Sequence, residues 1–310
     1  MTVWHGLRSQ AGMGATIAIA LTVSSVAACT GATHSASRPD RPALPSRHFE
    51  AADPKTWTLP IEAYLPTDDE QKQISRAENT LIGDCMDRFG FDWHPAPELP
   101  KLGPKTLTDW RYGIHDAALA DKRGYKPDAD EQAAYDEAME RGAVDGTTSG
   151  GPDAKVLSGQ IAKVAGKDVP AGGCAGQAKR KVTGGKPETP RLAQQISNDA
   201  FTRSKRDAKV AEAFRRWSSC MKDSGYPYKE PMDASDDPRF AAADVTTREI
   251  ATATADIACR KRHHVAKLWF DAEVKLQNTA IETHAEELSA ERKNLDTAVK
   301  RAARVLASGN

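Results

Sequence analysis

The chain has 310 residues, in which 43 Lys and Arg balance 43 Asp and Glu, and aromatic residues make up only 6%. With no net charge there is no long-range field, so a basic nucleic-acid-binding protein and an acidic tail protein are both excluded. A charged fraction of 28% and a negative mean hydropathy exclude a protein with many membrane spans.

The N-terminus is typical of a secreted protein. One basic side chain, Arg8, precedes an apolar stretch over residues 11–28, and no acidic residue occurs before Asp40. A positively charged start followed by a short apolar segment is the pattern of a signal peptide. The stretch is too short and too weakly flanked to predict a spanning helix. We therefore expect residues 1–28 to be a signal peptide that is removed on export.

The apolar stretch ends in Val-Ala-Ala-Cys at residues 26–29, which resembles the lipobox of bacterial lipoproteins, where the cysteine receives a diacylglycerol. Simple secretion without lipid, or an uncleaved anchor, is the alternative. Simple secretion would leave five cysteines and hence an unpaired thiol, whereas lipidation of Cys29 leaves four. We expect a protein held by this lipid at the extracytoplasmic face of the cell membrane, with a disordered tether over residues 29–56.

A nine-residue pattern occurs twice. Residues 85–93 and 220–228 both read Cys-Met-x-x-x-Gly-aromatic-x-aromatic, and each copy ends a run with helical spacing of apolar side chains. Glycine readily adopts the left-handed conformation that ends a helix, and in a Schellman ending the side chain after it meets one in the last turn. We predict two equivalent helix stops, formed by Met86, Gly90 and Phe91 and by Met221, Gly225 and Tyr226.

Each helix stop precedes a connection and then another cysteine. By this parallel we expect disulfides between Cys85 and Cys174 and between Cys220 and Cys259, each joining the end of one helix to the start of the next. The two other pairings of four cysteines stay open at this point. Each bridge is expected to stabilise the fold by about 4 kcal/mol in the loop-entropy model.

The expected fold is mostly α. It comprises two disulfide-clamped helical hairpin units, over residues 57–186 with a loop-rich insertion and over residues 187–310. Capping residues mark the expected helix starts, namely Thr67 with Glu70, Asp116, Asp128, and Thr246 with Glu249.

A long C-terminal helix is predicted beyond Thr246. Neither Pro nor Gly occurs between Thr246 and Ser308, and apolar residues recur every seven positions from Val274 to Ala302. Such a helix would span about 90 Å if it were continuous. Its apolar stripe needs a partner, and we expect the helix over about residues 190–224 of the same chain, with a homodimer as the alternative.

No catalytic motif stands out. The Ser-x-x-Lys of residues 219–222 matches penicillin-recognising enzymes, but it lies in a helix stop and the accompanying motifs are missing. Cys259 and His263 lie one helical turn apart with His264 beside them, which is a possible metal pair. A cysteine in a disulfide cannot bind metal as a thiolate, however. We therefore expect no catalytic residue, no metal and no cofactor.

The best candidates for a binding site are aromatic residues outside the expected helices, Trp110, Tyr112 and Tyr125, which lie close to acidic residues. They would line a binding groove or, as the interpretation we favour, form the local core of the insertion. Residues 155–209 have the opposite, basic bias. This basic segment is a candidate surface for anionic envelope polymer.

With its lipobox, its tether, the doubled motif and the Val-Pro-Ala-Gly-Gly-Cys-Ala-Gly segment at residues 169–176, the chain resembles the cell-surface lipoproteins common in actinobacteria. The resemblance implies a location and disulfides, with no catalytic residue to carry over.

We expect a non-enzymatic scaffold that presents helices to another envelope protein or to wall polymer. The alternative is a lipoprotein that binds a small molecule or metal, within residues 94–173 or near His263. A concave aromatic pocket in the insertion would favour this alternative, and a flat surface with a long exposed apolar stripe would favour the scaffold.

Overall fold

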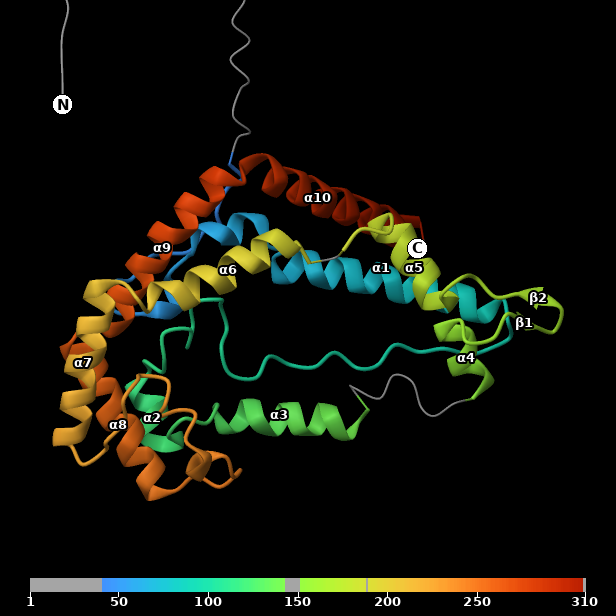
Figure 1. The fold of residues 1–310 in the computed structure, drawn as a ribbon. Coiled ribbons are helices and arrows are strands. Elements are labelled where there is room, and N and C mark those ends of the chain that lie inside the picture. The colour runs from blue at the N-terminus through green and yellow to red at the C-terminus, as the bar shows by residue number, and fades with distance from the viewer. Residues whose placement is uncertain (1–40, 143–150, 188, 309–310) are drawn as a thin grey trace, which may run out of the picture. The chain divides into compact units, whose positions relative to one another are not determined.

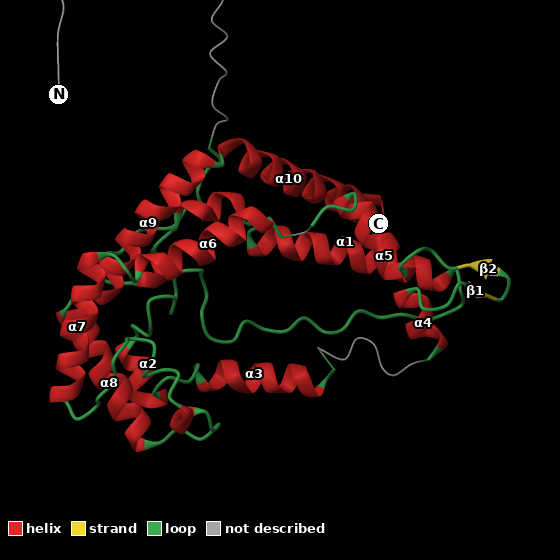
Figure 2. Cartoon of the chain, viewed as in Figure 1, coloured by secondary structure: helices red, strands yellow, loops and turns green. Residues whose placement is uncertain are grey.

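The computed structural model describes residues 41–142, 151–187 and 189–308. These residues belong to one unit that begins at Arg38, and its regular elements are helices apart from one small hairpin (Figure 2). The expected signal peptide, Cys29 and the first part of the tether lie outside the described residues. Within the described part of the chain, no helix is both long and apolar enough to cross a membrane.

Most helices follow one another with short connections. The α-helices are α1 (Asp68–Asp87), α2 (Ala117–Arg123), α3 (Ala129–Glu140), α4 (Pro152–Ser158), α5 (Gly173–Thr183), α6 (Arg191–Ser204), α7 (Ala208–Asp223), α8 (Thr247–Arg262), α9 (Val265–Thr283) and α10 (Ala285–Ser308). The 3-10 helices are η1 (Pro54–Thr56), η2 (Pro60–Tyr64) and η3 (Pro238–Phe240), and β1 (Lys163–Val164) pairs antiparallel with β2 (Lys167–Asp168).

The first disulfide-clamped hairpin consists of α1 and α5. Cys85, near the end of α1, is bonded to Cys174 at the start of α5, as the repeat predicts, with 5.6 Å between their Cα atoms. The helix stop after Cys85 has Schellman geometry, because the Phe91 amide donates to the Met86 carbonyl at 3.1 Å and Gly90 has a φ of +80°. Met86 is buried beneath this ending, so its role there is packing.

The second hairpin consists of α7 and α8, bridged by Cys220 and Cys259 with a Cα separation of 5.8 Å. The same Schellman bonds recur, with the Tyr226 amide donating to the Met221 carbonyl at 2.8 Å and a φ of +88° at Gly225. Both predicted pairings and both helix stops are therefore confirmed.

One detail of the second bridge differs from the expectation. It joins the last turns of two helices, and not the end of one to the start of the next. The reason lies in the cap, because the Thr246 hydroxyl accepts from the Glu249 amide at 3.1 Å and fixes the start of α8 there. Cys259 then falls in the last turn of α8.

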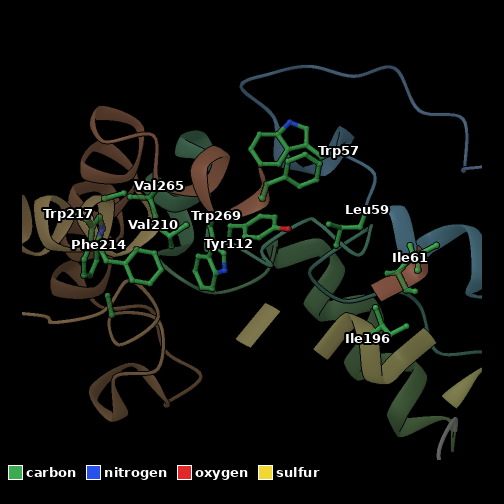
Figure 3. Close-up of a cluster of buried hydrophobic side chains, with 14 of the residues drawn as sticks. Trp57, Leu59, Ile61, Tyr112, Ile196, Val210, Phe214, Trp217, Val265 and Trp269 are labelled. Carbon is green, nitrogen blue, oxygen red and sulfur yellow. The ribbon is translucent and has the colours of Figure 1, made fainter. Parts of the chain in front are cut away.

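The largest core gathers aromatic residues from distant parts of the chain (Figure 3). The ring centroids of Tyr112 and Trp269 are 5.5 Å apart, those of Phe214 and Trp269 are 5.0 Å apart, and those of Trp57 and Phe270 are 4.8 Å apart. Tilted and edge-on contacts at these separations are the favoured arrangements of aromatic rings. A low aromatic content therefore still builds a core, because the few aromatic residues are concentrated in one place.

The prediction of a disordered tether over residues 29–56 is wrong for its described part, residues 41–56, because this segment makes defined contacts with the core. The Arg47 guanidinium donates to the Trp57 carbonyl at 2.7 Å and pairs with Glu62 at 2.5 Å. The Glu50 carbonyl accepts a hydrogen bond from the Trp57 indole at 2.8 Å. Polar contacts with the buried Trp57 thus attach residues 41–56 to the core, although the composition of this segment indicates disorder.

The long C-terminal helix is not continuous. It breaks into α8, α9 and α10 at His264, which has a φ of +51°, and at His284. The predicted partner is correct for α9, which packs on α6 and α7, whereas α10 touches α6 but lies mainly along α1 and α5 (Figure 1). The breaks let two parts of one stripe face different neighbours, so the stripe is buried within the chain at Ile281, Leu288, Leu295 and Ala302.

Candidate functional site

A hollow of about 440 Å³ lies beside the aromatic core. Three segments far apart in the sequence line it, namely residues 51–57, residues 114–115 and the junction of α8 with α9. Its volume falls within the range typical of small-molecule sites. We refer to it below as the junction pocket.

The floor of the junction pocket is apolar. Trp57, Ile114 and Ile257 line it, and all three are otherwise buried, at 1%, 9% and 3% exposure. Ile114 and Ile257 belong to a small apolar cluster between α2 and α8. These contacts fix the floor before any ligand arrives, and such preorganisation favours binding.

The rim of the junction pocket is cationic. It is formed by Lys261, His264 and Lys267, of which Lys267 pairs with Asp271 one turn further along α9 at 2.7 Å. Lys261 and His264 are exposed and make no ion pair with any described residue. Lys261 therefore gives the rim a positive charge that no described residue neutralises.

The backbone adds to this charge. His264 has left-handed φ and ψ angles, which are uncommon for histidine, and it starts α9 without a side-chain cap. Ala266 and Lys267, in the first turn of α9, line the junction pocket. Uncapped amides and the positive end of a helix dipole both attract anions.

His115 forms one wall of the junction pocket and lies between two carboxylates. Its Nε2 is 2.8 Å from Asp109 and its Nδ1 is 3.5 Å from Asp53. Burial alone would raise the pKa of Asp109, but hydrogen bonds from His115 and from the Lys105 amide outweigh it and hold that pKa below its ordinary value. The two carboxylates thus fix the orientation of the imidazole ring.

Arg260 is a structural part of the wall. Its guanidinium donates to Asp256 at 2.6 Å, to the Tyr112 carbonyl at 2.5 Å and to the Pro231 carbonyl. A Cβ on Gly113, which has a φ of +96°, would lie 2.2 Å from this guanidinium, so glycine is required there. Because its donors are used within the chain, Arg260 shapes the junction pocket and leaves recognition of an anion to the rim.

The aromatic residues suggested by the sequence do not line the junction pocket. Tyr112 is buried in the core, where burial and the neighbouring Glu273 carboxylate raise its pKa far above the ordinary value, and its hydroxyl donates to Glu273 at 2.8 Å. Tyr125 donates to Asp256 and packs against Phe240. Trp110 has a φ of +62°, and its ring covers a glycine. Their contacts are those of a local core.

The possible metal pair also has a structural explanation. Cys259 is consumed by its disulfide, and burial, aided by the charge of Arg262, lowers the pKa of His263. Among the described residues, no three His, Cys, Asp or Glu side chains are grouped so that they could hold a metal ion.

Comparison of the chain with protein-family models, with curated proteins and with solved structures gives no match. The junction pocket is therefore interpreted from its own residues. Sequence reasoning missed Trp57, His115, Lys261 and Lys267 as pocket residues. The nearest signal in the sequence is the His263-His264 pair, which continues a basic run and marks the alternative binding site near His263.

Proposed function

We propose that this chain is a lipid-anchored, extracytoplasmic protein that binds a small amphipathic anion in the junction pocket. The ligand class is an organic acid with an aromatic or aliphatic body. The observation that carries the proposal is the meeting of an apolar floor and a cationic rim in one hollow of ligand size.

The two surfaces of the junction pocket suit the two ends of such a molecule. An apolar body against Trp57, Ile114 and Ile257 would be stabilised by about 25 cal/mol for each Å² removed from water. A carboxylate or sulfonate at the rim would meet Lys261, His264 and the first amides of α9. A cation or a strongly polar neutral molecule would lack partners at one end or the other.

The same contacts support binding without catalysis. His115 is the histidine of the junction pocket with the most buried ring, and both of its nitrogens face carboxylates of the chain. The contacts with Asp109 and Asp53 therefore favour a structural role for His115 over a role in proton transfer.

The distribution of apolar surface supports the small-molecule alternative over the scaffold. The large apolar side chains that are exposed among the described residues are scattered along the chain, at Leu44, Phe49, Leu99 and Met139. The apolar stripe of α9 and α10 is covered by other helices. A long exposed apolar stripe was the feature that would have favoured helix presentation.

The anchored location is supported by the signal-peptide and lipobox patterns. Growth of a producing strain with labelled palmitate is expected to label the protein, and Cys29→Ala is expected to abolish the label and release the protein from membranes. An unlabelled, membrane-free wild type would contradict the anchor without bearing on the junction pocket.

Binding is tested with a pair of fluorescent probes that share one apolar body. Anilinonaphthalene sulfonate carries an anionic group, and phenylnaphthylamine has the same rings without it. We expect one site for the sulfonate on the Cys29→Ser protein. Exchanging Lys261→Gln together with His264→Gln is expected to weaken sulfonate binding at least about tenfold, which corresponds to about 1.4 kcal/mol. Affinity for the uncharged probe should change by less than about twofold.

Lys209→Gln is the matched control, because Lys209 is exposed on α7 and does not line the junction pocket. Equal loss of both probes in the rim variant, or equal affinity of wild type and rim variant for the sulfonate, would contradict the proposal. Native mass spectrometry of the isolated wild type then identifies a retained natural ligand, as extra mass that disappears on denaturation.

A further inference from the structure

A second hollow, of about 320 Å³, lies where the junction of α6 with α7 meets α9. It shares no lining residue with the junction pocket. Three cationic side chains, Arg203, Arg206 and Lys275, surround it, together with Asp207 and the apolar side chains of Ala272 and Leu276. We call it the arginine hollow.

The three cations make no ion pair within the described part of the chain. All three are exposed, so solvent weakens their mutual repulsion, but no ion pair with a described residue offsets it. Charged side chains gathered around a hollow raise the local concentration of ions of opposite sign. The arrangement therefore favours an anion.

Asp207 offsets only part of this charge. Its carboxylate caps α7, with one oxygen accepting from the Lys209 amide at 2.9 Å and from the Val210 amide at 3.4 Å. A capping carboxylate is held at the helix start and partly neutralised there by the helix dipole. The lining thus contains three cationic side chains and one carboxylate, and that carboxylate already caps a helix.

The turn that carries both arginines is anchored to the core. The amides of Arg206 and Asp207 donate to the carbonyls of Arg203 and Ser204, each at 3.0 Å. The Ser204 hydroxyl accepts from the Trp269 indole at 2.8 Å, which attaches the turn to the aromatic core.

Lys205, between the two arginines in sequence, is used by that core. Its ammonium lies 5.3 Å from the ring centroid of Phe201 and 5.4 Å from that of Trp269. These contacts of Ser204 and Lys205 fix the backbone of the turn. The side chains of Arg203 and Arg206 are not used in them and remain available to bind a ligand at the hollow. Guanidinium groups present several donors in a plane, a geometry that suits the oxygens of phosphate.

We propose that the arginine hollow binds a phosphate group. Two sources share this chemistry, a free phosphate compound and the headgroup of an anionic phospholipid. The headgroup source is supported by Arg41, whose guanidinium donates to Asn278 of α9 at 2.9 Å, three positions beyond Lys275. Cys29 lies twelve residues before Arg41, so an extended chain would reach about 40 Å from this point to a lipid on that cysteine.

The test uses the Cys29→Ser chain and two probes, inorganic pyrophosphate and phosphatidylcholine vesicles with or without phosphatidylglycerol. Calorimetry is expected to detect pyrophosphate binding that weakens as salt is added. Arg203→Gln with Arg206→Gln should lower this affinity at least about tenfold. Arg215→Gln with Arg216→Gln is the matched control, because that pair is also exposed on a helix but both guanidinium groups form ion pairs with Glu212.

Each result decides the proposal. Pyrophosphate binding without phosphatidylglycerol-dependent sedimentation supports a free phosphate compound, and sedimentation that the Arg203/Arg206 variant loses supports the headgroup. No binding to either probe, or an equal effect of the two double variants, would overturn the phosphate site. Pyrophosphate is not expected to displace anilinonaphthalene sulfonate, so failure here is distinguishable from failure of the junction pocket.

Discussion

The two copies of the helix stop have the same backbone geometry but different surroundings. The first copy and its bridge lie in a small cluster, where Cys85, Met86 and Cys174 pack with two residues of α4. The second lies in the largest core, with Trp217 and Trp269. The same nine-residue pattern therefore ends a helix in the same way wherever it occurs.

What each stop supports depends on its neighbours. Cys259 precedes Arg260 and Lys261 of the junction pocket by one and two residues, whereas no residue of the first cluster lines that pocket. The comparison teaches that a repeated motif fixes local geometry, while the position of the copy in the fold decides which site depends on it.

The largest expected effect is that of removing either disulfide, and its consequence for ligand binding should differ between the two copies. Replacing both cysteines of either bridge by alanine should lower the free energy of unfolding by about 4 kcal/mol. Loss of Cys220–Cys259 should also weaken binding of anilinonaphthalene sulfonate, because it frees the last turn of α8. Urea denaturation and probe titration measure the two effects. If loss of Cys85–Cys174 lowers the affinity for the probe by the same factor, the clusters around the two bridges are not independent.

The buried methionines sharpen the comparison further. Met86→Ala and Met221→Ala should each lower the free energy of unfolding by about 3 kcal/mol, since both side chains are fully buried. The location of the damage should differ. Hydrogen exchange is expected to accelerate mainly in α1, α4 and α5 for the first variant and in α7, α8 and α9 for the second. Identical exchange maps would refute a division into two clusters.

Substitution of the glycines tests the backbone geometry that the two helix stops share. Gly90→Ala and Gly225→Ala should cost the same, about 1 kcal/mol, because both have positive φ and neither has a heavy atom within 4 Å of an added Cβ. Thermal or urea denaturation measures both. Gly113→Ala serves as the contrast and should cost more, because its Cβ would collide with Arg260. A large difference between the first two variants would mean that the stops are not locally equivalent.

The smallest effect is expected at the start of α1. Burial opposes ionisation of Glu70, but hydrogen bonds from Arg292 of α10 and from Thr67 outweigh it and lower the pKa of Glu70. A lowered folded pKa means that this pair stabilises the fold above about pH 4.3 and that the contribution is lost as the pH falls through the folded pKa. Glu70→Gln should cost less than about 1 kcal/mol at neutral pH and flatten this part of the acid dependence.

Urea denaturation at neutral and acid pH measures this difference. Glutamine also completes a capping box, so the start of the helix should be retained in the variant. An acid dependence identical to that of the wild type would show that another carboxylate is responsible.

The features that the sequence predicted correctly are those that depend on a few adjacent residues. The capping box at Thr67, both glycine stops and the two bridges are of this kind. Even there the local signature has limits. Thr246-x-x-Glu249 resembles a second capping box, but the Glu249 carboxylate accepts from the Tyr125 amide at 3.1 Å instead of returning to its own helix start.

The features that were missed depend on where distant segments meet. No Pro or Gly marks the breaks at His264 and His284, because they arise from the different partners of α8, α9 and α10. The junction pocket joins Trp57, His115 and Lys261, and no spacing in a single sequence connects these three residues. The prediction of a tether up to residue 56 is wrong for the same reason. Arg47 is held by Trp57 and Glu62, and the residues next to it in the sequence give no sign of these contacts.

The first bridge joins cysteines that are 89 residues apart, and α2, α3 and α4 all lie between them. A protease that cuts the chain once anywhere in this interval would leave two polypeptides joined through sulfur. The cut protein would migrate as one species until it is reduced. The part of the chain that follows such a cut would thus keep a covalent connection to the part that precedes it after the backbone had been broken.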